Sequence, residues 1–306
     1  MRLLVLGLVF AYTLSAATFF VTVAGLGGEP DYEQRFSGLA ADLDRLFSQS
    51  ADARTRTLRG SEATKQRLRA VLAEVAAEAR PQDAVVLLVI GHGSFDGEQY
   101  KVNLPGPDVS AEELAGMLEP IRAERQLAAL MTSSSGVALP VLQRPGRVVI
   151  TATRSGTEKN AVVFSRYWVA ALQDPAADTD KNEVITALEA FQYADRKTAD
   201  FYKAQKRLAT EHALFEDTGA GEGVRQPGAS SGRGLLAGGF PLVRIGSAHR
   251  AYQDPAKRVL LERKEQLEQQ IDKLKYEKAA MPTAEYRKQL TALLLELAKT
   301  QEALER

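Results

Sequence analysis

The sequence contains no cysteine. That absence excludes disulfide bonds, thiolate zinc sites, iron–sulfur clusters, a cysteine nucleophile and a lipoprotein anchor. An excess of charge of one sign is also missing, because 39 Lys and Arg balance 39 Asp and Glu. A chain with a formal net charge of zero lacks the basic surface that nucleic-acid binding needs, so no nucleic-acid partner is expected.

The chain does have enough apolar sequence for a sizeable core. Of its 306 residues, 45% are hydrophobic. This length and composition predict one large domain or two smaller ones and are inconsistent with a disordered chain.

The amino-terminal segment has the features of an export signal. Arg2 precedes an uncharged run over residues 3–26, and the first half of that run ends in Ser15-Ala16-Ala17, a small-x-small sequence of the kind that signal peptidase cleaves. We therefore expect a signal peptide over residues 1–17 and a mature protein that is periplasmic or secreted. The alternative is an uncleaved anchor in the inner membrane, because a run of this length can also span a bilayer.

Strand-like and helix-like patterns alternate along the next part of the chain. Runs of strand length occupy residues 18–25, 84–90, 127–132 and 147–153, and helical patterns lie between them. Continuous rather than alternating hydrophobicity is typical of strands covered on both faces. The predicted fold class is α/β, a mostly parallel sheet with helices on both faces, in a domain over residues 18–218.

Three of these runs end in polar loops that contain glycine. The loops are the segments 91–94 (GHGS), 132–136 (TSSSG) and 151–156 (TATRSG). Because the carboxyl ends of parallel strands meet at the same edge of a sheet, the three loops predict a common site there.

The carboxyl-terminal part differs in composition. Eight glycines between residues 219 and 239 predict a glycine-rich, flexible linker over residues 219–252. From residue 253, apolar residues recur at spacings of seven and four, with a break at Pro282. This pattern predicts an antiparallel helical hairpin or coiled coil over residues 253–306. Such a hairpin either packs on its own domain or binds a partner, including a second copy in a homo-oligomer.

The polar loops resemble the site of the legumain-type cysteine peptidases, which have a caspase-like fold. The matching segments are VVLLVIGHGS at 85–94, LMTSSSG at 130–136 and VVITATRSGTE at 148–158. In that family His-Gly follows one strand, Ala-Cys-x-Ser-Gly follows the next and carries the nucleophile, and Thr-Ala follows the third and helps to line the primary specificity pocket. The resemblance covers residues 18–172 and implies a caspase-like fold.

The resemblance also implies roles for individual residues. His92 matches the catalytic histidine, and the backbone N–H of Gly93 would stabilise an oxyanion. Ser133 stands where the family has its nucleophilic cysteine. The pocket wall is matched by Thr153, Arg154 and Ser155. A cation at Arg154 would favour an acidic side chain in the cleft.

Serine in the cysteine position changes the expected function. A thiol is partly ionised at neutral pH, whereas a hydroxyl needs a base in direct contact and usually a third group that orients the base. Asp96 is the only nearby candidate for that third group. We therefore expect a protein without peptidase activity that binds a peptide or protein partner. The alternative is an active hydrolase that uses Ser133 with His92.

The segment 178–189 (DTDKNEVITALE) fits the twelve-residue EF-hand template. Position six is Glu183 instead of glycine, at a bend that prefers positive φ. The alternative is that Thr186 begins the next helix with a capping box and the aspartates are ordinary polar loop residues. The sequence requires no cofactor, and calcium is the one ion that it indicates. The expected ligands are Asp178, Asp180, Asn182, the Val184 carbonyl and Glu189.

Overall fold

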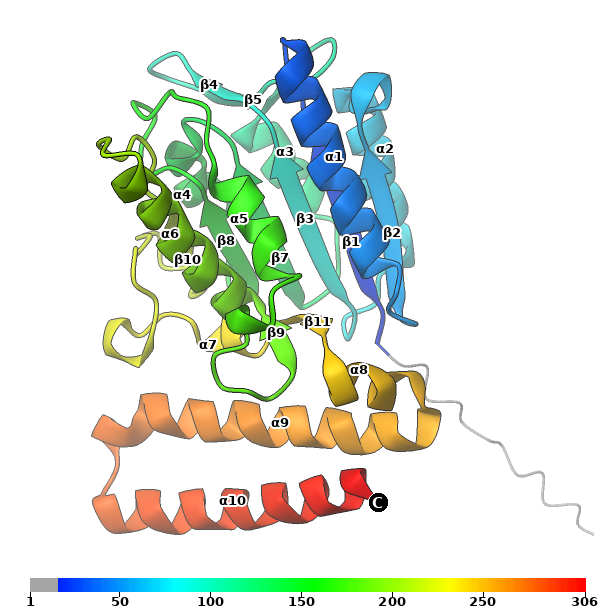
Figure 1. Cartoon of the computed structure of the whole chain (residues 1–306), viewed down its shortest axis with the longest axis vertical. Coiled ribbons are helices and arrows are strands. Elements are labelled where there is room, and N and C mark those ends of the chain that lie inside the picture. The colour runs from blue at the N-terminus through cyan, green and yellow to red at the C-terminus, as the bar shows by residue number, and fades with distance from the viewer. Residues whose placement is uncertain (1–15) are drawn as a thin grey trace, which may run out of the picture.

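The computed structural model describes residues 16–306 and is built around a six-stranded sheet (Figure 1). The strand order is β10-β8-β7-β3-β1-β2; the first five strands along the chain run parallel, and β10 is antiparallel to β8. The strands are β1 (Thr18–Ala24), β2 (Ala53–Leu58), β3 (Ala84–Ile90), β7 (Arg125–Met131), β8 (Arg147–Thr151) and β10 (Leu214–Glu216).

Helices cover both faces of this sheet. On one face lie α1 (Pro30–Phe47), α5 (Phe164–Ala171) and α6 (Ala187–Ala204). On the other face lie α2 (Lys65–Glu78), α3 (Ala111–Leu118) and α4 (Leu139–Leu142). The predicted α/β class, with a mostly parallel sheet between two helical layers, is confirmed.

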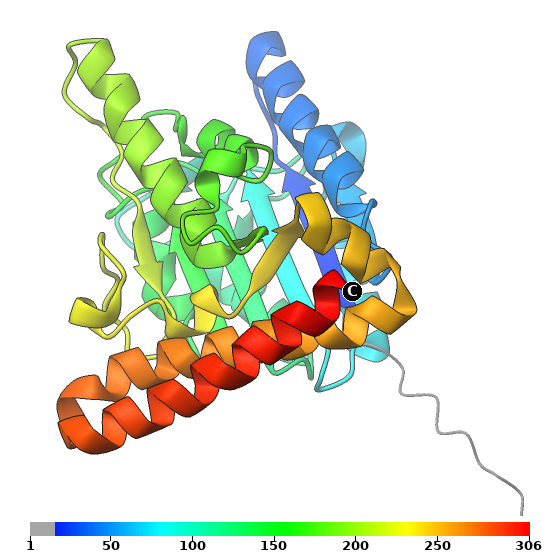
Figure 2. The ribbon, with the colours of Figure 1, turned by 60° about the horizontal axis from the view of Figure 1, so that its bottom comes forward.

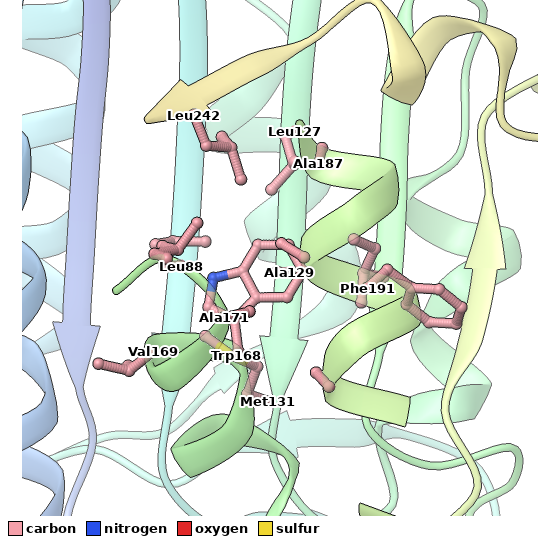
Figure 3. Close-up of a cluster of buried hydrophobic side chains, with 14 of the residues drawn as sticks. Leu88, Leu127, Ala129, Met131, Trp168, Val169, Ala171, Ala187, Phe191 and Leu242 are labelled. Carbon is pink, nitrogen blue, oxygen red and sulfur yellow. The ribbon is translucent and has the colours of Figure 1, made fainter. Parts of the chain in front are cut away.

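Two hydrophobic cores follow from the strand sequences. All seven residues of β3 are buried, and alternate side chains enter the core on either face. Figure 3 shows the core under α5 and α6, where Trp168 packs against Leu88 of β3 and Ala129 of β7. The continuous apolar pattern of β3 therefore reports burial on both sides.

Two small antiparallel sheets flank the main one. One follows β3 and consists of β4 (Gly93–Phe95), β5 (Tyr100–Val102) and β6 (Val109–Ser110). The other pairs β9 (Val184–Thr186) with β11 (Pro241–Arg244).

The segment 219–252, predicted as a glycine-rich linker, contains regular secondary structure. The segment contains α7 (Leu235–Gly238), β11 and α8 (Gly246–Gln253), and it places Phe240 in the core. The buried carboxylate of Asp217 accepts hydrogen bonds from three backbone N–H groups, those of Gly234, Leu236 and Ala237. Side-chain capping of this kind fixes a segment that its glycine content alone would leave mobile.

The helical hairpin at the carboxyl terminus is confirmed. It consists of α9 (Pro255–Glu277) and α10 (Thr283–Glu305), which lie side by side across the amino-terminal ends of the strands (Figures 1 and 2). An ion pair between Arg244 and Glu265, with a 2.7 Å contact from Nε to Oε1, joins β11 to α9. The main packing partner of α10 within the described chain is α9.

Nearly all of the expected signal peptide, residues 1–15 of 1–17, lies outside the described residues. No helix within residues 16–306 combines the length and apolarity that crossing a bilayer requires.

Candidate functional site

The structure brings the three polar loops together at the carboxyl-terminal edge of the sheet. The loops follow β3, β7 and β8, which are adjacent strands. The Ser134 hydroxyl donates to the Gly156 carbonyl at 3.1 Å, and Gly156 packs so closely on Phe95 that a Cβ atom there would lie 2.2 Å from the ring. We call this region, formed by residues 91–95, 132–136 and 151–156, the strand-end rim; Ser94 and Arg154 are exposed at its surface.

The turn after β7 is held rigidly. Ser134 adopts the left-handed conformation, with φ of 55°, and its N–H donates to the Glu158 carbonyl. The Ser135 hydroxyl donates to the Thr132 carbonyl at 2.9 Å and lies 3.2 Å from the Thr153 hydroxyl. A strained residue held by this many contacts is typical of a functional turn, and it fixes the position of the backbone around Ser133.

Thr153 supports this turn from the neighbouring strand. Its side chain is fully buried, and its hydroxyl accepts a hydrogen bond from the N–H of Gly136 at 3.0 Å. Thr153, predicted as part of the pocket wall, thus uses its hydroxyl to hold the two loops together. The two loops also approach closely at Gly136, where a Cβ atom would lie 2.2 Å from the Arg154 backbone, so a larger residue does not fit at this position.

Gly93 lies directly against the turn that carries Ser133. A Cβ atom at Gly93 would stand 2.4 Å from the Ser133 carbonyl oxygen. Next to it, the Tyr100 hydroxyl and the Thr132 hydroxyl are 2.5 Å apart in the interior. Burial raises the pKa of Tyr100, so its phenol stays protonated at neutral pH. The strand-end rim is thus closely packed beneath its surface.

The His92 side chain lies against the segment that follows β1, which is the neighbour of β3 on the side away from β7. Its ring packs edge-on against Tyr32 and Phe36 of α1, with centroids 4.7 and 5.1 Å away. Burial lowers the pKa of His92, although a hydrogen bond to the Gly27 backbone and the charge of Glu29 oppose this effect. Gly27 and α1 follow β1, which lies on the side of β3 away from β7.

Ser133 lies at the rim without a hydrogen bond to His92 or Asp96 in the described part of the chain. The residue is 2% exposed, and within residues 16–306 no hydrogen bond joins its hydroxyl to His92. Asp96 does not orient the imidazole, because its carboxylate accepts from the N–H groups of Glu98 and Gln99. These hydrogen bonds lower the pKa of Asp96 and tie it to a surface turn.

The segment after β8 contributes to a cluster of charged and polar side chains around Glu158, which the sequence did not indicate. Glu158 pairs with Arg154 at 3.2 Å and with His212 Nδ1 at 2.5 Å, and its carboxylate also accepts from the His212 N–H. Both the side chain and the backbone N–H of His212 therefore contact the Glu158 carboxylate. Arg154 remains 59% exposed, so it can still meet an external carboxylate. Ser155 contacts Thr157 through its hydroxyl at 2.8 Å.

The predicted calcium loop brings three carboxylates together away from the rim. Oxygen atoms of Asp178, Asp180 and Glu189 all lie within 4.8 Å of one another. Burial, followed by the charges of Glu189 and Asp178, raises the pKa of Asp180 to about 6. Position six, Glu183, takes a left-handed φ of 67°. A cation would relieve the repulsion among these groups.

The remaining expected ligands have other contacts as well. The Asn182 side-chain oxygen accepts from the Val184 N–H at 2.8 Å, and Val184 belongs to β9. The capping-box alternative is present too, because the Thr186 hydroxyl and the Glu189 carboxylate exchange hydrogen bonds with each other's N–H groups. Glu189 thus begins α6 and also faces the two aspartates.

Comparisons with known proteins gave structural similarities only. No family model matches the sequence, and a search of curated proteins found no match. The Drosophila initiator caspase Dronc is similar with a TM-score of 0.46 and 11% identity over 68% of this chain and 82% of that one. Caspase-1 from Spodoptera frugiperda gives 0.47 and 10% over 66% and 87%, and protein GSU0716 from Geobacter sulfurreducens gives 0.44 and 10% over 71% and 96%.

Proposed function

We propose that this protein is an exported, non-catalytic binding module of the caspase-like type. Its strand-end rim would recognise a segment of a peptide or protein partner. The observation that carries the proposal is the placement of His92, whose ring engages Gly27, Tyr32 and Phe36 and makes no hydrogen bond with Ser133. A serine hydroxyl without a base in contact is a poor nucleophile.

The surface of the rim supports a binding role. Ser94 is exposed and Phe95 is partly exposed, so the rim offers a hydroxyl and an aromatic edge beside the Arg154 cation. An apolar body surrounded by a few polar groups is typical of surfaces that recognise peptides. Arg154 indicates that the bound segment carries an acidic side chain, because its guanidinium is only partly neutralised by Glu158.

The test is a mass-spectrometric assay with a diverse peptide mixture. The protein is incubated with the mixture, peptides retained with it are identified after size-exclusion chromatography, and all peptides are searched for new termini. We expect retention of acidic peptides and no cleavage. Cleavage at a consistent residue that disappears in a His92→Ala variant, with the fold intact by circular dichroism, would contradict the proposal.

We also propose that residues 178–189 bind calcium. Three observations support this: the twelve-residue template, the clustered oxygens of Asp178, Asp180 and Glu189, and the left-handed bend at Glu183. Binding would be weak, because a non-glycine residue at this bend is strained. Calorimetric titration with calcium chloride tests the proposal, with magnesium chloride as the control.

A further inference from the structure

One face of α10 packs against α9. The residues of this inner face recur every three or four positions along α10. Near the carboxyl-terminal end of α10, the Lys257 ammonium of α9 donates a hydrogen bond to the Leu304 carbonyl at 3.0 Å. An ion pair between Arg263 and Glu296 flanks it. Most of the inner face is only partly buried, although Thr300 is buried. The inner face consists of Tyr286, Leu290, Leu293, Leu297, Thr300 and Leu304.

The opposite face of α10 is apolar at its centre and has no partner within the described chain. Leu294 and Leu295 are 47% and 60% exposed, which places them among the few large hydrophobic side chains that the described residues expose. Thr291 and Ala298 lie one turn to either side of them and are also exposed. Residues 291, 294, 295 and 298 therefore form an outer stripe at helical spacing, turned away from α9.

The charges along this outer stripe reverse from one end to the other. Arg287 and Lys288 lie toward the start of α10, and Glu302 and Glu305 lie toward its end, all of them exposed. If a second α10 is laid antiparallel across the first, with the twofold axis between positions 294 and 295, position 287 falls opposite position 302. The same operation places Thr291 opposite Ala298. The stripe is thus complementary to its own reversed copy.

We propose that α10 pairs antiparallel with α10 of a second copy of this chain. The leucines meet at the twofold axis, the small side chains allow close approach on either side, and an Arg287–Glu302 pair closes each end. The balanced charges favour this occupant over an anionic membrane surface, which attracts a face with a basic excess. In the single chain, Glu302 contacts Arg306 one turn away, but both side chains are exposed, so this contact is readily exchanged for one across the interface.

Sedimentation-velocity ultracentrifugation of the full chain tests the pairing. The concentration series should run from about 1 to about 300 µM, because a single pair of helices of this length buries less surface than a stable dimer usually needs. We expect the mass to rise toward twice 33.3 kDa. A Leu294→Ser/Leu295→Ser variant should stay monomeric. Val259→Ser, which removes another exposed apolar side chain from the hairpin at α9, is the matched control and should associate as the unaltered chain does.

Charge exchange tests the antiparallel register. Arg287→Glu alone and Glu302→Lys alone should each weaken self-association about tenfold, because two attractive contacts per dimer become repulsive. An equimolar mixture of the two variants should regain the original association, since each introduced charge then faces its opposite. A monomer at every concentration, an association that the leucine variant does not change, or a mixture no stronger than its components would each overturn the proposal.

Discussion

The absence of cysteine makes one experiment unusually direct: a Ser133→Cys variant carries the only thiol in the protein. That thiol reports on the environment of the position at which the sequence resemblance predicts a nucleophile. Its alkylation rate as a function of pH gives the pKa of the thiol, because only the thiolate reacts. The experiment therefore measures whether His92 acts on position 133.

The structure predicts a slow reaction. A free thiol has a pKa of about 8.5, so about 7% of it is thiolate at pH 7.4. Ser133 is only 2% exposed, and burial raises the pKa of a thiol. At a fixed pH, each unit of increase in the pKa lowers the thiolate fraction about tenfold. His92 supplies no compensating positive charge, because burial lowers its pKa and its ring packs against Tyr32 and Phe36 without a hydrogen bond to Ser133. We expect alkylation at least ~10-fold slower than at an exposed position.

The assay is iodoacetamide labelling followed by intact-mass spectrometry between about pH 6 and pH 10, a range that brackets the titration of a thiol. Ser94→Cys provides the exposed reference on the same rim. Adding His92→Ala to the Ser133→Cys variant should change the rate less than twofold, given the separate contacts of the two residues. The reasoning is refuted if the Ser133→Cys thiol reacts faster than the Ser94→Cys thiol at pH 7 and His92→Ala abolishes that advantage.

Further predictions concern binding, calcium, pH and packing. Arg154→Glu should weaken the retention of acidic peptides about tenfold, whereas Arg122→Glu, at an exposed position before β7, should not; equal retention by both variants in the peptide assay would exclude recognition through Arg154. Calcium at 100 times its dissociation constant should stabilise the protein against thermal unfolding by about 2.7 kcal/mol, and Asp178→Asn should remove most of that gain. A melting temperature that calcium does not change would contradict calcium binding at residues 178–189. Burial raises the pKa of Glu211, so the stability that this group contributes is greatest below its unfolded pKa of about 4.3 and is lost as the pH rises through the folded pKa. Glu211→Gln should therefore reduce the dependence of the unfolding free energy on pH, measured by urea titrations at several pH values. An unchanged pH dependence would argue against this assignment. Trp168→Ala should cost about 3–5 kcal/mol in urea unfolding. Trp168→Phe should cost clearly less, because the buried indole N–H has no acceptor among residues 16–306 to lose; equal costs would contradict this prediction.

Much of the fold could be predicted from hydrophobic patterns alone. The runs at β1 and β3 are continuous because both faces are covered, and the Leu68, Val71, Leu72 and Val75 stripe of α2 is buried as its spacing indicates. Strand β2 escaped prediction for the opposite reason. It lies at the edge of the sheet with mostly half-exposed residues, among them the charged Arg56, so its sequence lacks the apolar run of a central strand.

The candidate site could be predicted less completely. The meeting of the three loops follows from strand order, and the sequence indicated it. The contacts of His92 with Gly27 and α1 depend on which neighbour of β3 its ring faces, and no local pattern encodes that choice. The Glu158–His212 pair joins residues 54 apart along the chain, so only the tertiary fold reveals it. Asp217 likewise stabilises α7 across a stretch of glycines that a local pattern indicates as flexible.

The hairpin and the strand-end rim occupy opposite ends of the molecule (Figure 1). Two chains joined through α10 therefore carry their rims at the far ends of the assembly, directed away from each other. Such an arrangement cannot close both rims over one short peptide. It is suited to bridging two separate targets, or two distant sites on one extended target, so that the second contact benefits from the effective concentration that the first creates.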